Sequence, residues 1–305
     1  MTARMVQLSG VIVDLIYTVE QVPLPGTEAI VHDSTLTAGG GINAMIAARR
    51  TGVAVDYAGT LGTGPLSDIV EKALRAEEIG ILRPRLKDMD QGCCTVLVDR
   101  DGERSFVAAP GADGVVRTED LAGIQVRADD WFLISGYALG YAGSHAALSQ
   151  WLANPPEGLR LVFDPCPLVA QIKPAAREAA MHAATWITAN MSEAEFLTGF
   201  ADPAKAASAL AKGRAGGALV RMGADGCHFA AADGESIHLP GYRVDAIDTN
   251  GAGDAHTGAF IALLSRGETP LEAAKIANVC AAFSTTREGP ATAPFLSTAL
   301  EAMGR

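Results

Sequence analysis

The sequence of 305 residues has little charge, few aromatic side chains and no long hydrophobic run. Charged residues make up 19% and the net charge is −11, which argues against a surface that attracts nucleic acid or anionic membranes. No apolar run approaches the ~20 residues of a membrane-spanning helix. Asp14 interrupts the apolar beginning of the chain, so we expect a β-strand at 6–16 and not a signal peptide.

Cysteine is scarce as well. The five cysteines are scattered, and no CxxC, HExxH or other zinc-binding spacing occurs. This excludes a disulfide framework, and we expect free, buried thiols in the reducing cytoplasm. The sequence also lacks GxxxxGK[ST], which excludes a P-loop, and HRD or DFG, which excludes a protein kinase. A GxGxxG after the first strand is missing too, which argues against a dinucleotide-dependent oxidoreductase.

The sequence does contain enough apolar residues for a large core, 49% of the total. From residue 131 onward, short apolar runs alternate with helical patterns, which is typical of a parallel sheet covered by helices on both faces. No linker or repeat divides the chain, so we expect one α/β domain over residues 1–305. Its expected strands are 131–135, 159–164, 185–189 and 218–222, and its expected helices are 143–152, 192–198 and 203–212.

The first third of the chain does not follow this alternation. Asp99-Arg100-Asp101-Gly102 has the composition of a turn between two strands of a hairpin. We expect segments 10–35 and 90–112 to form a small β-sheet that projects as a lid, with Asp14 at the end of the first strand. The expected strands are 6–16, 28–32, 53–60, 93–98 and 103–109, and the expected helices are 43–50 and 66–78.

The segment AIDTNGAGDAHTGA, residues 246–259, carries the strongest chemical signal. Gly251, Ala252 and Gly253 precede Asp254 and an apolar run, which predicts a tight turn that opens a helix. The first N–H groups of a helix lack internal partners, and glycines let an anion approach them closely. Phosphoryl transfer to a hydroxyl needs such donors and a base beside them. Because a helix N-terminus favours the ionised carboxylate, we expect Asp254 to be a weak base.

Six segments together resemble the ribokinase-like (PfkB) family of carbohydrate kinases. They are GVIVDLI, AGGGINAMIAARRTG, TANMSEAEFLTG, RMGADGCHF, DTNGAGDAHTGAF and IANVCAAFSTTREGP, in that order along the chain. The resemblance implies a ribokinase-like three-layer α/β fold: a central, mostly parallel sheet with helices on both faces, plus a small β-sheet lid. It also implies ATP and Mg²⁺ as cofactors, a small sugar as substrate and a homodimer formed through the lid.

The resemblance further implies roles for individual residues. Asp254 would be the catalytic base, and Gly251, Ala252 and Gly253 would form the anion hole. The substrate would be bound by Asp14, Gly39, Gly40 and Asn43. The nucleotide would be bound by Asn190, Arg221, Gly223, Gly226 and Asn278. Glu193 would hold Mg²⁺ through water, and Asp248 would contribute to a monovalent cation site, such as one for K⁺.

Other interpretations of these residues stay open. Asp14 can merely cap a turn, and Asn190 with Glu193 also fits a capping box. We expect an ATP-dependent kinase that phosphorylates a terminal hydroxymethyl group of a sugar. A nucleoside kinase of the same fold needs an aromatic slot, which the sequence does not make evident. A non-catalytic sugar-sensing homologue is disfavoured because Asp254, Glu193 and the glycine turn are intact.

Overall fold

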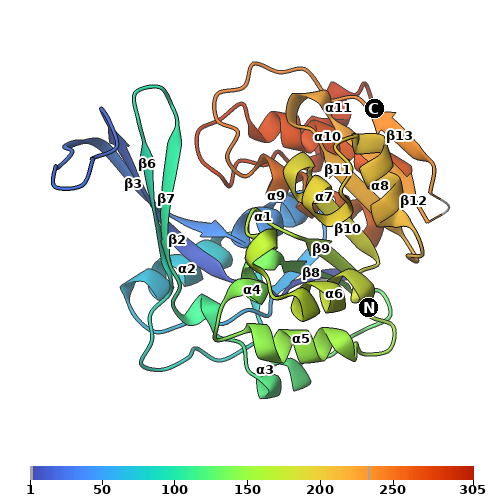
Figure 1. The fold of residues 1–305 in the computed structure, drawn as a ribbon, viewed down its shortest axis with the longest axis horizontal. Helices are drawn as coiled ribbons and strands as arrows, with labels where there is room; N and C mark the ends of the chain where they lie inside the picture. Colours follow the sequence, from blue (N-terminus) through green and yellow to red (C-terminus); the bar gives the residue numbers. More distant parts are fainter. Residues whose placement is uncertain (1–2, 233) are drawn as a thin grey trace.

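The computed structural model describes residues 3–232 and 234–305 (Figure 1). Within these residues a nine-stranded sheet has the order β13-β12-β11-β10-β9-β8-β1-β4-β5. Its strands are parallel except for β12 and β13, which run antiparallel to their neighbours at one edge. The strands are β1 (Arg4–Gln7), β4 (Ala54–Tyr57), β5 (Gly80–Ile81), β8 (Trp131–Ser135), β9 (Leu161–Asp164), β10 (Trp186–Asn190), β11 (Gly217–Arg221), β12 (Cys227–Ala231) and β13 (Ser236–Leu239).

Two layers of helices cover this sheet, one on each face, and each layer has its own apolar cluster. The first layer is α1 (Ile42–Arg50), α2 (Pro65–Ala76), α9 (Ala252–Ser265), α10 (Pro270–Ser284) and α11 (Leu296–Ala302). The second is α3 (Thr118–Ala122), α4 (Gly136–Gly140), α5 (His145–Ala153), α6 (Pro174–Ala183), α7 (Met191–Thr198) and α8 (Pro203–Ala211). None of these helices is long and apolar enough to cross a membrane.

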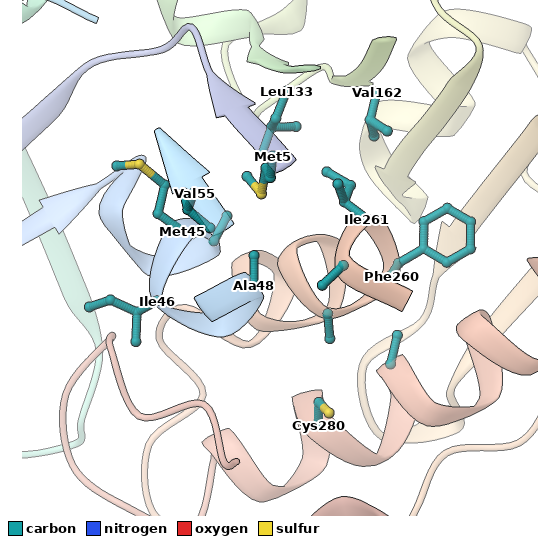
Figure 2. Packing of buried hydrophobic residues seen from close by; sticks show 14 of the residues in the cluster. Met5, Met45, Ile46, Ala48, Val55, Leu133, Val162, Phe260, Ile261 and Cys280 are labelled. Atoms are coloured by element: carbon teal, nitrogen blue, oxygen red, sulfur yellow. The ribbon is translucent and has the colours of Figure 1, made fainter. Parts of the chain in front are cut away.

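Helix α9 lies at the centre of the first layer (Figure 2). Phe260 and Ile261 face the sheet, where Phe260 meets the edge of Trp186 with ring centroids 5.1 Å apart. Cys280 of α10 lies behind α9 on the side away from the sheet. Residues 255–263 of α9 are all buried between the central sheet and the neighbouring helices. This packing on both sides fixes the direction in which the N-terminus of α9 points.

A second sheet projects from the main body as a lid (Figure 1). It has the order β3-β2-β6-β7, and β2 runs parallel to β6 while the other pairs are antiparallel. The strands are β2 (Val11–Val19), β3 (Val31–Gly40), β6 (Cys93–Val98) and β7 (Arg104–Ala109). The predicted three-layer α/β fold with a small β-sheet is therefore confirmed.

Several local predictions for the first third of the chain were wrong. Segment 6–16 is not one strand but β1 and β2, which belong to different sheets. The chain turns at Gly10, where a Cβ would lie 2.7 Å from the Cβ of Asp113, so only glycine fits. Asp14 consequently lies within β2 of the lid and not at the end of the first strand. The strand expected at 28–32 is β3 (Val31–Gly40), displaced toward the glycines that lead into α1.

Candidate active site

The N-terminus of α9 presents backbone donors that lack partners. Gly251 is the N-cap residue with φ +75°, and a Cβ there would lie 2.2 Å from the Pro290 carbonyl oxygen. No side chain caps the helix, and the N–H groups of Gly251, Gly253 and Asp254 have no acceptor among the described residues. Ala252 N donates to the Thr249 carbonyl at 3.3 Å. Three open N–H groups at the positive end of a helix dipole form a site for an anion.

Asp254 stands beside these donors in contact with Asn43. Asn43 Nδ2 donates to Asp254 Oδ2 at 3.0 Å, which joins α1 to α9. Burial raises the pKa of Asp254 to about 6, although the bond from Asn43 and the charge of Arg221 act in the other direction. The charges of Asp164 and Asp14 add to the rise. Asp254 is therefore a stronger base than its first-turn position predicts, because burial outweighs the helix terminus.

Asp14 lies on the lid strand with its carboxylate unpaired. Its side chain is 8% exposed, and no hydrogen bond to it occurs within the described residues. Burial raises the pKa of Asp14 to about 6. Gly39 lies on the adjacent strand, and a Cβ there would lie 1.9 Å from Asp14 Oδ2, so the glycine leaves room for this position of the Asp14 side chain. Gly40 follows with φ +65° and begins the turn into α1, which carries Asn43.

Asn43, which contacts Asp254, adds a second unpaired group beside that carboxylate. Its Oδ1 atom is buried without a hydrogen-bond partner. Buried polar atoms are nearly always paired, so this acceptor is available to a hydrogen-bond donor from outside the protein chain. An unpaired carboxylate on Asp14 and an unpaired amide oxygen on Asn43 accept hydrogen bonds, which suits the hydroxyl groups of a sugar.

Arg221 lies beneath the anion hole at the end of β11. Its Nη1 donates to Asp164 Oδ2 at 3.1 Å and to the hydroxyls of Thr188 and Thr257. Within the described residues neither Nε nor Nη2 makes a hydrogen bond, and neither is among the fully buried unpaired atoms. A Cβ on Gly253 would lie 3.5 Å from Arg221 Nε and 3.6 Å from Nη2. This free edge of the guanidinium faces the mouth of α9 and matches two oxygens of a phosphoryl group.

Asn190 and Glu193 form the capping box of α7. Glu193 N donates to Asn190 Oδ1 at 2.9 Å, and Asn190 N donates to Glu193 Oε2 at 2.8 Å. Asn190 Nδ2 donates to Glu193 Oε1 at 2.8 Å. Burial raises the pKa of Glu193 to about 7, and the charge of Asp164 adds to the rise. Since Glu193 is 3% exposed, its carboxylate is held rigidly at the edge of the site.

The acidic residues fit a weakly held Mg²⁺ and not a closed metal cage. No group of three or more potential metal ligands occurs in residues 3–232 and 234–305. Mg²⁺ typically keeps several waters and binds through one or two carboxylates together with substrate phosphates. Glu193 is the residue expected to hold such an ion through water, and both of its carboxyl oxygens already accept hydrogen bonds from Asn190, with Arg221 Nη2 3.9 Å from Oε2.

Asp248 lies in the loop that leads to α9, and its carboxylate already has three partners. Oδ1 accepts from Arg104 Nη2 of the lid at 2.7 Å and from Asn250 N at 2.8 Å. Oδ2 accepts from Gly289 N at 3.0 Å. Burial alone would raise the pKa of Asp248, but these three bonds outweigh it and lower the pKa. A monovalent cation here would share the carboxylate oxygens with the guanidinium of Arg104.

The remaining residues that we expect to bind the nucleotide, Gly223, Gly226 and Asn278, shape the turn after β11 and the segment after β13. Gly223 and Gly226 have φ of +61° and +89°, and a Cβ on Gly226 would lie 2.2 Å from the Leu239 carbonyl oxygen. Asn278 uses its whole amide within the protein. Its Nδ2 donates to the carbonyls of Leu239 and Pro240 at 3.1 Å, and its Oδ1 lies 3.1 Å from His256 Nε2. This network ties α10 to the segment that follows β13.

The structure also brings together residues that the sequence did not single out. Asp164, Thr188 and Thr257 surround Arg221, and only the position of Asp164 at a strand end gave a signal. Tyr137 and Tyr141 lie in and just after α4, at the carboxyl end of β8. Burial raises the pKa of Tyr141 to about 12 and also raises that of Tyr137, to which the charges of Asp254 and Asp164 contribute. Tyr137 thus lies close to the charged centre, and Tyr141 follows it one helical turn later.

Open N–H groups at a helix start, a neighbouring carboxyl group and unpaired hydrogen-bond acceptors meet at the carboxyl edge of an α/β sheet, an arrangement that suits a phosphotransferase acting on an alcohol group. Residues 3–298 match the sequence profile described as pfkB family carbohydrate kinase. The chain therefore belongs to the PfkB family and is an ATP-dependent carbohydrate kinase.

Individual relatives agree with this assignment. The ribokinase of Haemophilus influenzae is 29% identical over 296 residues, which cover 92% of this chain and 92% of the relative. The aminoimidazole riboside kinase of Salmonella typhimurium is 28% identical over 274 residues, 84% of each protein. The structure of Arabidopsis thaliana ribokinase with ribose and ATP superposes with a TM-score of 0.82 at 18% identity and covers 100% of both chains. The chain is thus similar to kinases of sugars and of ribosides.

Proposed function

We propose that this protein transfers the γ-phosphoryl group of ATP to a terminal hydroxymethyl group of a small sugar. The observation that carries the proposal is the contact between Asn43 and Asp254, 3.0 Å long, at the mouth of a helix whose N–H groups are open. It joins the glycine-rich segment beside the lid to the glycine turn of α9. A sugar bound by Asp14 and Asn43 would lie next to Asp254, and a phosphoryl group at Gly251–Gly253 would lie on its other side.

The transfer itself uses few residues. The substrate hydroxyl oxygen forms a bond to the γ-phosphorus while the bond from that phosphorus to the β-phosphate bridging oxygen breaks. The hydroxyl proton goes to Asp254, and the electron pair of the broken bond leaves with ADP. The open N–H groups and the free edge of Arg221 stabilise charge on the phosphoryl oxygens. Mg²⁺, when bound near Asn190 and Glu193, supplies positive charge to the phosphates.

Gly223, Gly226 and Asn278 support the nucleotide from the other end. The two glycines permit the tight turn after β11, and Asn278 holds the segment after β13 in place. A monovalent cation at Asp248 is compatible with this scheme only if it shares oxygens with Arg104.

A riboside is the second candidate substrate. The sequence showed no evident aromatic slot for a base, but Tyr137 provides a ring beside the site, and Tyr141 follows just after the same helix. Stacking on such rings is a common way to hold a planar ring system. A free pentose or hexose needs no such contact, so the two candidates differ in what these tyrosines do.

The lid also offers a surface for a second copy of the chain. Leu36, Phe106 and Val107 are exposed on its strands, and Ile30, next to β3, is 77% exposed. Apolar side chains gathered on one sheet favour a homodimer. Size-exclusion chromatography with light scattering would test this, and a monomeric mass at micromolar concentration would contradict it. The five free cysteines fit a location in the reducing cytoplasm.

A screen for acceptor-dependent ADP release tests the proposed function. The acceptors should be pentoses, hexoses, keto-deoxy sugar acids and nucleosides, each with Mg·ATP. We expect turnover with at least one sugar and a loss of about 10²–10⁴-fold in the Asp254→Asn variant. Turnover restricted to nucleosides would favour the second candidate, and in that case Tyr137→Ala should raise the nucleoside KM. Absence of turnover with every acceptor would contradict both.

A further inference from the structure

The lid touches the nucleotide side of the protein through one polar contact. Arg104, at the beginning of β7, donates from Nη2 to Asp248 Oδ1 at 2.7 Å. Among the described residues, no other hydrogen bond or ion pair joins the lid strands to residues 161–305. The pair is 144 residues apart in sequence, and its side chains are 28% and 12% exposed. A pair this shielded is screened less than an exposed one.

The acceptor side of this pair leads directly to the anion hole. The Asp248 carboxylate also binds Asn250 N and Gly289 N. Asn250 immediately precedes Gly251, the N-cap of α9, and the Pro290 carbonyl lies against Gly251 so closely that a Cβ would meet it at 2.2 Å. The guanidinium of Arg104 therefore binds the carboxylate that organises the loop in front of the open N–H groups.

On the donor side, the strands of the lid connect Arg104 to Asp14, the residue that we propose binds the sugar. Arg104 pairs with Val98 across the β6–β7 hairpin, and β6 pairs in turn with β2, where Asp14 is opposite Cys94. Any tilt of the hairpin moves Asp14 with it, because hydrogen-bonded strands move as one unit. The ion pair thus connects the residue proposed to bind the sugar with the loop proposed to bind the phosphoryl group.

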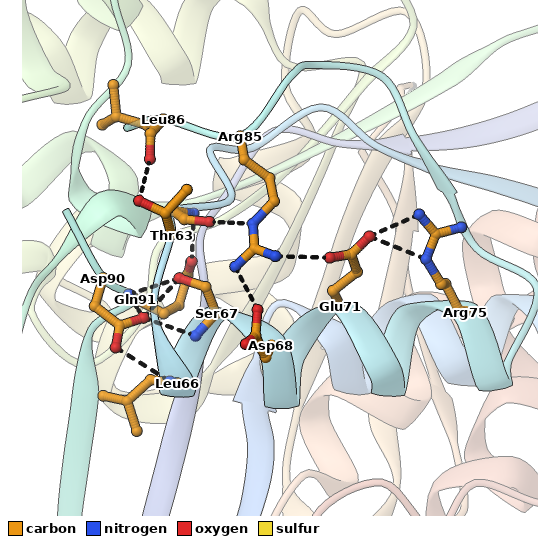
Figure 3. Close-up of polar contacts among 11 residues, drawn as sticks. Thr63, Leu66, Ser67, Asp68, Glu71, Arg75, Arg85, Leu86, Asp90 and Gln91 are labelled. Atoms are coloured by element: carbon orange, nitrogen blue, oxygen red, sulfur yellow. Dashed lines mark hydrogen bonds and ion pairs between the residues drawn. The ribbon is translucent and has the colours of Figure 1, made fainter. Parts of the chain in front are cut away.

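Several hydrogen bonds anchor the base of the lid at residues 90–92. Among the described residues the far end of the β6–β7 hairpin lacks such anchors, so the single ion pair of Arg104 can determine where the hairpin lies. Gly92 N donates to Asp113 Oδ1 at 2.7 Å, and Gln91 Nε2 donates to the carbonyls of Val11 and Thr60. Asp90 accepts from Leu66 N and Ser67 N at the beginning of α2 (Figure 3). The turn at 99–103, beyond Arg104, has no contact with the main body among these hydrogen bonds.

We propose that Arg104 is a positioning residue whose ion pair with Asp248 holds the lid closed on the loop of the anion hole. The expected effect of Arg104 on sugar KM and ADP release rests on the proposed function, whereas its effect on the position of the lid does not. With the pair intact, the sugar pocket and the anion hole are aligned and water is excluded from the phosphoryl group. Without the ion pair, the hairpin moves away from the main body about its anchored base. Asp14 is then no longer aligned with Asp254, and water reaches the phosphoryl group.

Arg100 provides a matched control on the same hairpin. It pairs with Glu20 at 3.3 Å, and both side chains are about two-thirds exposed, at 67% and 69%. Arg100→Gln removes the same charge as Arg104→Gln from the same hairpin but breaks a contact within the lid only. A difference between the two variants therefore reports the contact with Asp248 and not the loss of positive charge.

Hydrogen–deuterium exchange of residues 93–109 in the ligand-free protein tests the structural part. We expect Arg104→Gln and Asp248→Asn to increase exchange several-fold, and Arg100→Gln to match the wild type. High salt should speed exchange in the wild type modestly, because the pair is only partly shielded, and should change the Arg104→Gln variant less. Wild-type exchange in Arg104→Gln, or equal effects of both arginine variants, would overturn the proposal. If Arg104→Gln does not fold, Arg104→Lys and the salt titration of the wild type decide the question.

Kinetics tests the functional part. In Arg104→Gln we expect the KM for the sugar to rise about tenfold while the KM for ATP changes less than about twofold. ADP release without any acceptor should increase relative to coupled turnover, which a merely structural role would not produce. A proportional loss of both activities would overturn the positioning role. If the wild type phosphorylates no acceptor, the proposed function fails, and the exchange experiment still decides whether Arg104 closes the lid.

Discussion

Asn43 and Asp254 are 211 residues apart in sequence, and their side chains are joined by a hydrogen bond of 3.0 Å. Asn43 belongs to α1, the helix that follows the lid strand β3, and Asp254 belongs to the first turn of α9. Both helices lie in the same layer against the central sheet. The bond therefore places the base beside the pocket that would hold its substrate, and it leaves Asn43 Oδ1 buried and unpaired for a ligand.

Replacing Asp254 by asparagine should abolish most turnover. The variant keeps the volume of the side chain and an oxygen that can accept from Asn43, but it cannot take the hydroxyl proton. We expect kcat to fall by about 10²–10⁴-fold, the usual contribution of a general base. ATP affinity, measured by calorimetry, should change little because the open N–H groups remain. A variant with nearly normal kcat would remove Asp254 from the mechanism.

The pH dependence of kcat/KM should follow the buried carboxylates. Burial raises the pKa of Asp254 and of Asp14 to about 6, so both are protonated at lower pH. Because Asp254 must be ionised to accept a proton, kcat/KM should fall as pH decreases below about 6 and stay level above it. In Asp14→Asn the fall should persist with a shallower slope. A profile that stays flat down to pH 4.5 would show that neither carboxylate titrates in this range.

The same pKa shift predicts that Asp254 lowers stability at neutral pH. Between its unfolded pKa of 3.8 and its folded pKa of about 6, the folded protein binds more protons than the unfolded chain. The free energy of unfolding therefore falls as pH rises through this window and stays lower above it. Asp254→Asn should have a higher Tm than the wild type at pH 8, and the difference should shrink at pH 5. An equal Tm difference at both pH values would contradict the assigned shift.

Asp14 and Gly39 should act on the sugar and not on ATP. Asp14→Ala removes an unpaired carboxylate from the pocket, so the KM for the sugar should rise about 10-fold or more with the KM for ATP nearly constant. Gly39→Ala should have a similar effect, because its Cβ would lie 1.9 Å from Asp14 Oδ2 and displace that side chain. Equal effects on both substrates would mean that Asp14 supports the lid only.

Arg221→Lys should separate charge from geometry. The lysine keeps a positive charge near Asp164 and Glu193, but it lacks the pair of N–H groups that face the mouth of α9. We expect kcat to fall about 10²-fold, as for loss of one preorganised donor to a transition-state oxyanion. Thermal unfolding checks that the variant is folded. An unchanged kcat would limit Arg221 to neutralising the acidic cluster.

Local signals explain why much of the candidate site was predictable from the sequence. The turn before Asp254 needs Gly251 in a left-handed conformation, and the capping box of Asn190 and Glu193 is encoded within four residues. Alternating strand and helix patterns placed most elements of the central sheet within a few residues of their observed bounds. Turns, capping boxes and strand or helix patterns depend on residues that are close together in the chain, so the local sequence is enough to predict them.

Contacts between distant segments were not accessible in this way. Nothing in the local sequence of residues 6–16 indicates that this apolar run is divided between two sheets. The chain turns at Gly10 because Asp113, more than 100 residues away, packs against it. The pKa of Asp254 was misjudged because burial by surrounding elements outweighs the helix terminus.

The sequence by itself determined the turn chemistry, the alternation of strands and helices after residue 131, and the residue types that we propose bind phosphate and hydroxyl groups. The tertiary structure alone decided which of these residues meet: Asn43 with Asp254, Arg221 with Asp164, and Arg104 of the lid with Asp248. The physical reason is that backbone geometry is a property of short segments, whereas burial and charge pairing depend on which segments the packed core brings together.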